Sequence, residues 1–394
     1  MLKSSKYRLY PTKSQAELLD KHFGCCRFIY NWALDKKINY YKEAKENIDA
    51  YDIIRQITAL KKQPETLWLN EVSINALQQE VLHIENAFRK FFKEKRGFPK
   101  FKAKNKCRDS YSIPVQVYIK DNKIQIPKLK LVKVRPHPVS EGEIKTCVVS
   151  KSRTGKYYIS ILFETNESIP SLKPVAEQTS IGIDTGIKNF VTCSDGRVFS
   201  NPQYLRSNIE RIKILSKRLS RKQNGSKNRN KARIRLAKAY EKVANQRIDY
   251  IHKVVCELTN GENQADSIFI EDLNLQGMLS NRRLALSFID SSIGLFYETL
   301  YYKCKWKGIN LIKIGRFEPS SKLCTCGVKN ESLKLSDRTW TCQYCGKTHD
   351  RDLLAAQNIK RFGLNTYNTG GGTPGEPLEM SAVAESVKEE YQII

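Results

Sequence analysis

The spacing of apolar residues changes twice along the chain, and this limits the fold more than any other feature of the sequence. From Lys13 to about Lys102 apolar residues recur every three or four positions, which predicts a helical unit. From Ser112 to about Glu164 they occur in short β-rich runs separated by turn residues. The chain has 394 residues. At roughly 150 residues per domain, we expect an α+β protein of two or three structural units.

The residues after 175 combine strands with helices, which predicts an α/β core. Strands are expected at four places: Ser180–Asp184, Phe190–Cys193, Ser267–Glu271 and Ile309–Ile314. An amphipathic helix is expected from about Phe288 to Trp306, and a last helix from about Asp352. The Gly-rich segment after Gly363 is typical of a disordered tail.

The charge balance indicates a polyanionic partner. Lys and Arg number 68 and Asp and Glu number 41, which gives a formal net charge of +27. Fourteen of the cations lie between Arg206 and Lys242, where only Glu210 and Glu241 oppose them. Apolar stripes on either side of Gly225 predict a hairpin of two helices there. Such a charge run is often only a solvated face, but two acids cannot neutralise this one, so we predict that it binds nucleic-acid phosphates.

Composition excludes several other classes of protein. Hydrophobic residues make up 40% and charged residues 28%, which is typical of a folded chain rather than a disordered one. No apolar run is long enough to span a membrane, and the first residues lack the pattern of a secretory signal. Seven cysteines show no ligand spacing with one another and are expected to be buried thiols in a reducing compartment, the cytoplasm: Cys25, Cys26, Cys107, Cys147, Cys193, Cys256 and Cys304.

Three acidic positions at the ends of apolar elements form a candidate metal site. They are Asp184 in IGIDTG, Glu271 in IFIEDLN, and Asp350 or Asp352 in HDRDLLAAQNI. A carboxylate at the end of a buried strand is costly unless a cation or hydrogen-bond donors compensate it, and oxygen ligands suit Mg²⁺ or Mn²⁺. Two such ions would activate water on one side of a phosphodiester and stabilise the leaving oxygen on the other. The alternative is that each acid merely caps a helix or occupies a turn.

Helical geometry distinguishes the two late aspartates. Asp352 shares a helix face with Ala356 and Ile359, whereas Asp350 lies just outside the helix and suits an N-cap. We therefore expect Asp352 to be the metal ligand.

The remaining four cysteines form two closely spaced pairs. Cys324 and Cys326 are followed, after fifteen residues, by Cys342 and Cys345, and a glycine comes directly after each pair. Two such pairs can surround one Zn²⁺ tetrahedrally. The first pair is C-x-C instead of the usual C-x-x-C, so free or redox-active thiols are the alternative, with His349 or Cys304 as substitute ligands.

A series of short motifs resembles the TnpB (OrfB) family of transposon-encoded proteins over about residues 7–362. In chain order the motifs are YPT, FGCCRFIYNWAL, GFPKFKAK, GIDTGIKNF, SRKQNGSKNR, IEDLNLQGM, FEPSSKLC and C-x-x-C-G-x-x-x-DRD. The family is related to type V CRISPR effectors. The resemblance implies an RNA-guided DNA endonuclease that acts beside a short flanking motif, with a guide RNA and a target DNA as partners; the oligomeric state is left open.

The resemblance also implies an α+β multidomain fold with a RuvC/RNase H-like nuclease core. Asp184, Glu271 and Asp352 match the family's metal-binding acids, and Cys324, Cys326, Cys342 and Cys345 match its zinc ligands. The expected parts are a wedge-like β domain (1–12 and 107–175), a helical recognition lobe (13–106), a RuvC-like nuclease domain (176–315 and 346–362), a zinc-ribbon insertion (316–345) and the disordered tail (363–394).

The sequence departs from the family pattern at two places, which affect the expected zinc site and the expected cleavage. The C-x-C spacing alters the geometry available to zinc, and Leu354 occupies a position where the family commonly has Asn. An RNA-guided DNA-binding regulator with a silent site is therefore an alternative, although retention of all three acids argues against it. A transposase is a further alternative, because strand transfer uses similar chemistry and the same acids would serve it. The sequence around Asp184 also resembles aspartic proteases and actin-like ATPases, but neither class explains the charge, the cysteines and the other acids together.

Overall fold

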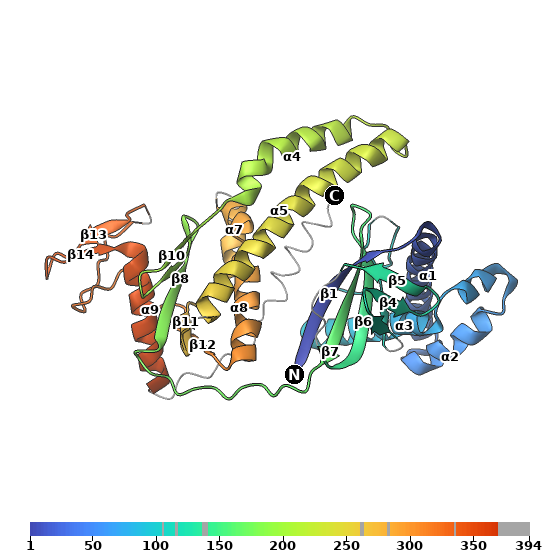
Figure 1. The fold of residues 1–394 in the computed structure, drawn as a ribbon, viewed down its shortest axis with the longest axis horizontal. Coiled ribbons are helices and arrows are strands. Elements are labelled where there is room, and N and C mark those ends of the chain that lie inside the picture. The colour runs from blue at the N-terminus through green and yellow to red at the C-terminus, as the bar shows by residue number, and fades with distance from the viewer. Residues whose placement is uncertain are drawn as a thin grey trace. The chain divides into compact units, whose positions relative to one another are not determined.

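A computed structural model describes residues 1–104, 106–114, 117–135, 141–260, 264–281, 284–334 and 336–368 (Figure 1). The chain divides into two compact units, Met1–Ser168 and Ile169–Ile394. The expectation of a mixed α and β protein is confirmed.

A seven-stranded antiparallel sheet forms the base of the first unit. Its strands are β1 (Leu2–Tyr10), β2 (Asp109–Ile113), β3 (Tyr118–Lys120), β4 (Lys123–Ile126), β5 (Lys130–Val134), β6 (Glu143–Lys151) and β7 (Tyr157–Glu164). The order is β2-β6-β7-β1-β5-β4-β3. Because β1 pairs with β7 and β5, the first residues of the chain complete a sheet whose other strands begin at residue 109.

Helices between β1 and β2 cover this sheet. They are α1 (Lys13–Ala44), α2 (Ala50–Leu60), the 3-10 helix η1 (Pro64–Glu71) and α3 (Ile74–Glu94). Thr12 and Gln15 form a reciprocal capping box at the start of α1. Alternate residues of β7 are buried, as expected for a sheet with one face packed on a core, and α1 and α3 contribute to that core.

A five-stranded mixed sheet lies at the centre of the second unit. Its strands are β8 (Ser180–Thr185), β9 (Asn189–Cys193), β10 (Val198–Ser200), β11 (Ser267–Ile270) and β12 (Asn310–Lys313), in the order β10-β9-β8-β11-β12. β8, β11 and β12 are parallel, and β9 and β10 are antiparallel extensions of the sheet. All four residues of β11 are buried, which indicates cover on both faces.

Different helices cover the two faces of this sheet. The second unit contains α4 (Tyr204–Ser220), α5 (Lys227–Thr259), α6 (Leu275–Ser280), α7 (Ala285–Ser291), α8 (Ile293–Lys307) and α9 (Arg351–Asn368), and the short strands β13 (Thr339–Thr341) and β14 (Thr348–Asp350). Ile183 and Ile270 share a core with residues of α5 and α8. Phe269, whose side chain points the other way, packs with Ile359 of α9. The α9 side of the sheet is therefore distinct from the α5 and α8 side.

The predicted hairpin of two basic helices is confirmed as α4 and α5. Ile212 of α4 packs with Leu236 and Val243 of α5. Gly225 lies between the helices with φ of +78°, a conformation that favours glycine. Ile251, Val255 and Leu258 in the later part of α5 pack in the core of the five-stranded sheet instead. Many cations of the two helices are on exposed positions.

Three expectations about local structure need correction. The helix expected from about Phe288 is two helices, because Ser292 has φ of +52° and ends α7 before α8 begins. α9 continues to Asn368, past the expected start of the tail at 363; residues 369–394 lie outside the described part. Among the seven isolated cysteines, Cys256 is exposed and Cys107 half-buried, so not all of them are core thiols.

A helix that crosses a lipid bilayer must be both long and apolar. None of the helices in the described ranges combines enough length with enough apolar character to do so.

Candidate functional site

Asp184 and Glu271 lie at the carboxyl ends of neighbouring parallel strands. Asp184 belongs to the end of β8, and Glu271 directly follows β11. The register pairs Ile183 with Ile270, so the two acids occupy the next aligned positions. Neighbouring strands are about 4.8 Å apart. The sheet therefore holds these two side chains next to each other.

Both acids belong to the face of the sheet that α9 covers. Successive side chains alternate between faces, so Asp184 shares a face with Gly182, and Glu271 with Phe269. A Cβ atom at Gly182 would lie 2.1 Å from the backbone oxygen of Ala356, so only glycine permits this approach of α9. The close packing at Gly182 thus fixes α9 beside the end of β8.

Asp352 lies in the first turn of α9 and has two polar partners. Arg338 Nη1 is 3.1 Å from its Oδ1, and Asn189 Nδ2 is 3.3 Å from its Oδ2. Asp350 has a different role, because its Oδ1 accepts a hydrogen bond of 2.9 Å from the Leu353 backbone N–H. This is the N-cap bond expected for Asp350.

Two of the three acids, Asp184 and Glu271, have raised pKa values. Burial, together with the nearby charges of Glu271 and Asp352, raises the pKa of Asp184 from its ordinary value of 3.8 to about 8. Burial also raises the pKa of Glu271, although the hydroxyl of Ser320 opposes that shift. Asp184 and Glu271 are therefore poorly compensated by protein groups alone, which favours a cation beside them.

The three carboxylates do not form a closed cluster. Among the described residues, only the four paired cysteines bring all their ligand atoms within 4.8 Å of one another. At least one separation within the set Asp184, Glu271 and Asp352 therefore exceeds 4.8 Å. Asp352 is instead paired with the Arg338 guanidinium.

A series of buried hydrogen bonds that ends at Glu271 was not predicted from the sequence. Ser320 donates a hydrogen bond to Glu271 Oε1. Asn358 of α9 is 2% exposed, and its Nδ2 donates to the backbone oxygens of Ser320 and Leu323, both at 2.7 Å. The sequence signal for this contact was Asn358 itself, a polar amide on the apolar face of a helix, six residues after Asp352. This series connects α9 to Glu271 through the loop before Cys324.

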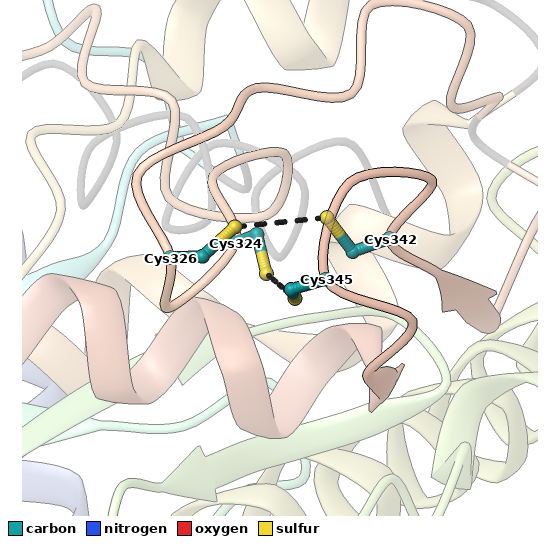
Figure 2. Close-up of side chains that lie close together, drawn as sticks. All are labelled: Cys324, Cys326, Cys342 and Cys345. Atoms are coloured by element: carbon teal, nitrogen blue, oxygen red, sulfur yellow. Dashed lines mark hydrogen bonds between the residues drawn. The ribbon is translucent and has the colours of Figure 1, made fainter.

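The four paired cysteines converge as the sequence predicted (Figure 2). Cys324 Sγ is 3.6 Å from Cys345 Sγ, and Cys326 Sγ is 3.7 Å from Cys342 Sγ. Zn–S bonds of about 2.3 Å place the corners of a tetrahedron roughly 3.8 Å apart. A disulfide would require about 2.05 Å. The four sulfurs are therefore compatible with one bound zinc ion despite the C-x-C spacing.

The surroundings of the cysteines explain how they are held. Gly327 and Gly346 have φ of +91° and +70°, which allows the tight turn after each pair. His349 Nε2 is 3.1 Å from Cys324 Sγ. Although burial opposes it, hydrogen bonding to the Cys326 backbone and to His349 lowers the pKa of Cys324 to about 5.

Cys304 was a candidate substitute ligand, and Leu354 departs from the family pattern; both have clear positions in the structure. Cys304 is buried in α8 and does not belong to the cluster of four sulfurs. Leu354 is 1% exposed and packs against Cys324, Trp340 and Cys342. Leu354 therefore joins α9 to the cysteine-bearing segment through apolar contact.

Three family models match parts of the chain. The IS605 OrfB model, described as "Probable transposase", matches residues 160–282. An associated "Helix-turn-helix domain" model matches residues 1–46, which here contain β1 and α1. A model described as "Cas12f1-like, TNB domain" matches residues 294–359, which include the four paired cysteines.

Relatives of known name match over nearly the whole chain. Two bear the name "Putative RNA-guided DNA endonuclease". The one from Streptomyces pristinaespiralis is 35% identical and covers 98% of this chain and 96% of its own length. The one from Escherichia coli K12, InsQ, is 29% identical, with 96% and 98% covered.

One solved structure shares the overall fold. The chain in a cryo-EM structure of a Cas12f1–sgRNA–target DNA complex aligns with a TM-score of 0.56 and 15% identity. The alignment covers 91% of this chain and 98% of that one.

Proposed function

Because this chain belongs to the TnpB (OrfB) family, we propose that it is an RNA-guided DNA endonuclease whose nuclease core is RuvC-like. The observation that carries the proposal is the position of Asp184 and Glu271 at aligned ends of β8 and β11, with Asp352 on the helix that packs against β8. The sheet order β10-β9-β8-β11-β12 supports an RNase H-like core. In such systems base pairing selects the target, while the protein contacts the backbone and a short duplex motif.

The three acids are proposed to hold Mg²⁺ or Mn²⁺. Their oxygens suit these ions, and the raised pKa values of Asp184 and Glu271 indicate that a positive charge is needed there. When bound, the ions polarise the scissile phosphate and favour ionisation of the attacking water. Ser320 orients the Glu271 carboxylate through its hydroxyl. Arg338 is available to exchange its contact with Asp352 for one with a substrate phosphate.

The remaining parts are assigned by their charge and by the family resemblance. The basic hairpin α4–α5 is proposed to follow nucleic-acid phosphates, because residues 206–242 within it carry 14 cations and only two acids. The sheet of the first unit is proposed as the wedge-like domain and helices α1–α3 as the recognition lobe. The four paired cysteines are proposed to bind one structural Zn²⁺.

A transposase is the second candidate, because the family model over residues 160–282 carries that description. Strand transfer would use the same acids, since both reactions attack a phosphodiester. A joining assay with a labelled transposon end separates the two functions: an endonuclease releases cut ends without joining them to a second DNA.

The decisive experiment uses the full chain purified with its copurifying RNA. We expect it to cut a matched DNA in magnesium, and Asp184→Ala or Glu271→Ala to abolish cutting while leaving DNA binding intact. Asp350→Ser is the matched control, since it removes an adjacent carboxylate but retains the N-cap oxygen. Cutting by the Asp184→Ala/Glu271→Ala double variant would refute the assignment.

A further inference from the structure

Four phenylalanines meet at the end of α3. We call Phe88, Phe91, Phe92 and Phe98 the phenylalanine cluster. The ring of Phe98 is centred 5.5 Å from that of Phe88 and 5.4 Å from that of Phe91, with interplanar angles of 86° and 84°. Phe92 contacts Phe91 at 5.0 Å. Edge-to-face packing of this kind stabilises the rings against one another, so the cluster is ordered before any partner binds.

Two of the four rings of the cluster are exposed, whereas Phe88 and Phe91 are half-buried and Phe88 packs on the core of the first unit. Phe92 is 73% exposed and Phe98 is 47% exposed, and Phe101, three residues further on, is 56% exposed. By contrast, Tyr297 of α8 is fully buried. Single exposed aromatics are ordinary, but two exposed rings that pack on the same pair of half-buried rings mark a binding surface.

The charges around the cluster limit what binds there. From residue 89 to residue 104 eight cations face one acid, Glu94. Arg96 pairs with Glu94, and Lys102 pairs with Glu80. Within the described ranges, the other lysines of this segment form no ion pair: Lys90, Lys93, Lys95, Lys100 and Lys104. A second copy of the same surface would be repelled, whereas a polyanion would be attracted.

Unpaired nucleotides combine the two properties that this surface requires. Their phosphates complement the lysines, and their bases offer flat apolar faces that stack on aromatic rings. Bases inside a duplex are already stacked on one another. If the proposed function holds, the RNA supplies the only single strand before a target is opened.

We propose that the phenylalanine cluster is a stacking platform for unpaired nucleotides of the bound RNA, with the neighbouring lysines contacting their phosphates. This rests on the proposed function only for the identity of the RNA. The platform lies in the first unit and requires no residue of the acid site.

The test uses the full RNA-free chain and a single-stranded RNA of about twelve nucleotides that carries 2-aminopurine, a base whose fluorescence is quenched by stacking. Wild type is expected to quench the probe. Phe92→Leu, which keeps an apolar side chain but no ring, is expected to lose that quenching and to weaken binding roughly fivefold or more, as removal of one stacked ring does. Phe92→Trp should restore both. Tyr51→Leu is the matched control, because Tyr51 is 64% exposed on α2, outside the cluster.

Replacing lysines should give a different signature. Lys93→Gln with Lys100→Gln is expected to reduce the salt dependence of binding but to leave quenching intact at saturating RNA. The readout uses no target DNA, so a failure of cleavage would not affect it, and its own failure would leave the endonuclease proposal standing.

Three outcomes would overturn the proposal. One is that Phe92→Leu quenches the probe and binds the RNA as well as wild type does. Another is stronger quenching of a DNA strand of the same sequence than of the RNA. The third is a Phe92→Leu variant that changes the sedimentation of the RNA-free protein without changing RNA affinity, which would make the cluster a contact between protein chains.

Discussion

The hydroxyl of Ser320 donates a hydrogen bond to the carboxylate of Glu271, although the two residues are 49 positions apart in the chain. The backbone oxygen of Ser320 in turn accepts a hydrogen bond from Asn358. An acid at the end of a strand is thereby oriented by a loop, and that loop is fixed by the same helix that carries Asp352.

Ser320→Ala is expected to slow cleavage by roughly ten- to a hundredfold, because a hydrogen bond to a charged group contributes roughly 1.5–3 kcal/mol. The hydroxyl lowers the pKa of Glu271. Its loss should therefore move the acidic limb of the pH–rate profile to higher pH. Ser320→Thr keeps the hydroxyl and serves as the control. Identical rates and profiles for the two variants would show that this hydrogen bond does not contribute to catalysis.

Asn358→Ala should destabilise the protein, because it leaves two buried backbone oxygens without their donor. Each unsatisfied group costs about 1–3 kcal/mol. Denaturant unfolding measures the loss. Gln357→Ala changes the exposed neighbour on the same helix and should have little effect. Equal stabilities for the two variants would contradict the anchoring role of Asn358.

The pKa of Asp184 predicts how stability depends on pH in magnesium-free buffer. The folded-state pKa is about 8 and the ordinary value is 3.8, so between these values the folded chain retains a proton that the unfolded chain has lost. Stability is therefore expected to fall as pH rises from about 4 to about 8 and then to level off.

Asp184→Asn removes this titration. The variant should melt at a higher temperature than wild type at neutral pH, while being inactive in cleavage. Added Mg²⁺ should stabilise wild type more than the variant. Melting curves at pH values from 4 to 9 measure these effects; a wild type that gains stability over that range relative to Asp184→Asn would contradict the raised pKa.

The positions of the acids and cysteines were predictable because they depend on local sequence. Asp184 and Glu271 each end an apolar strand, and helical spacing distinguished Asp352 from Asp350. The partners of these residues were not predictable. Arg338 reaches Asp352 from another segment, and Ser320 reaches Glu271 across 49 positions, so both contacts depend on how loops pack.

Some features of the fold also required the structure. The break between α7 and α8 occurs at Ser292, which has a left-handed backbone although no glycine or proline signals it. The exposure of Phe92 was similarly hidden, because an apolar residue at helical spacing is usually part of a core.

Removing zinc should loosen the cysteine-bearing segment. We expect one zinc ion per chain by elemental analysis, and a faster hydrogen exchange of residues 316–349 after chelation or in Cys345→Ser. Cys256→Ser replaces an exposed cysteine outside the cluster and should change neither measurement. A metal-free protein with unchanged protection in this segment would reject the zinc site.

Neutralising exposed cations of the α4–α5 hairpin should change how binding depends on salt. Lys217, Arg221 and Lys231 are exposed, and each phosphate contact contributes roughly 0.7–0.9 to the slope of log affinity against log salt. Replacing all three with Gln is expected to reduce that slope by roughly two to three units, measured by titrating nucleic acid at several salt concentrations. Lys253→Gln is the control, because Lys253 on α5 is already paired with Asp249 at 2.8 Å. If the triple variant kept the slope of wild type, the basic hairpin would be a solvated surface and the phosphates would have to be bound elsewhere.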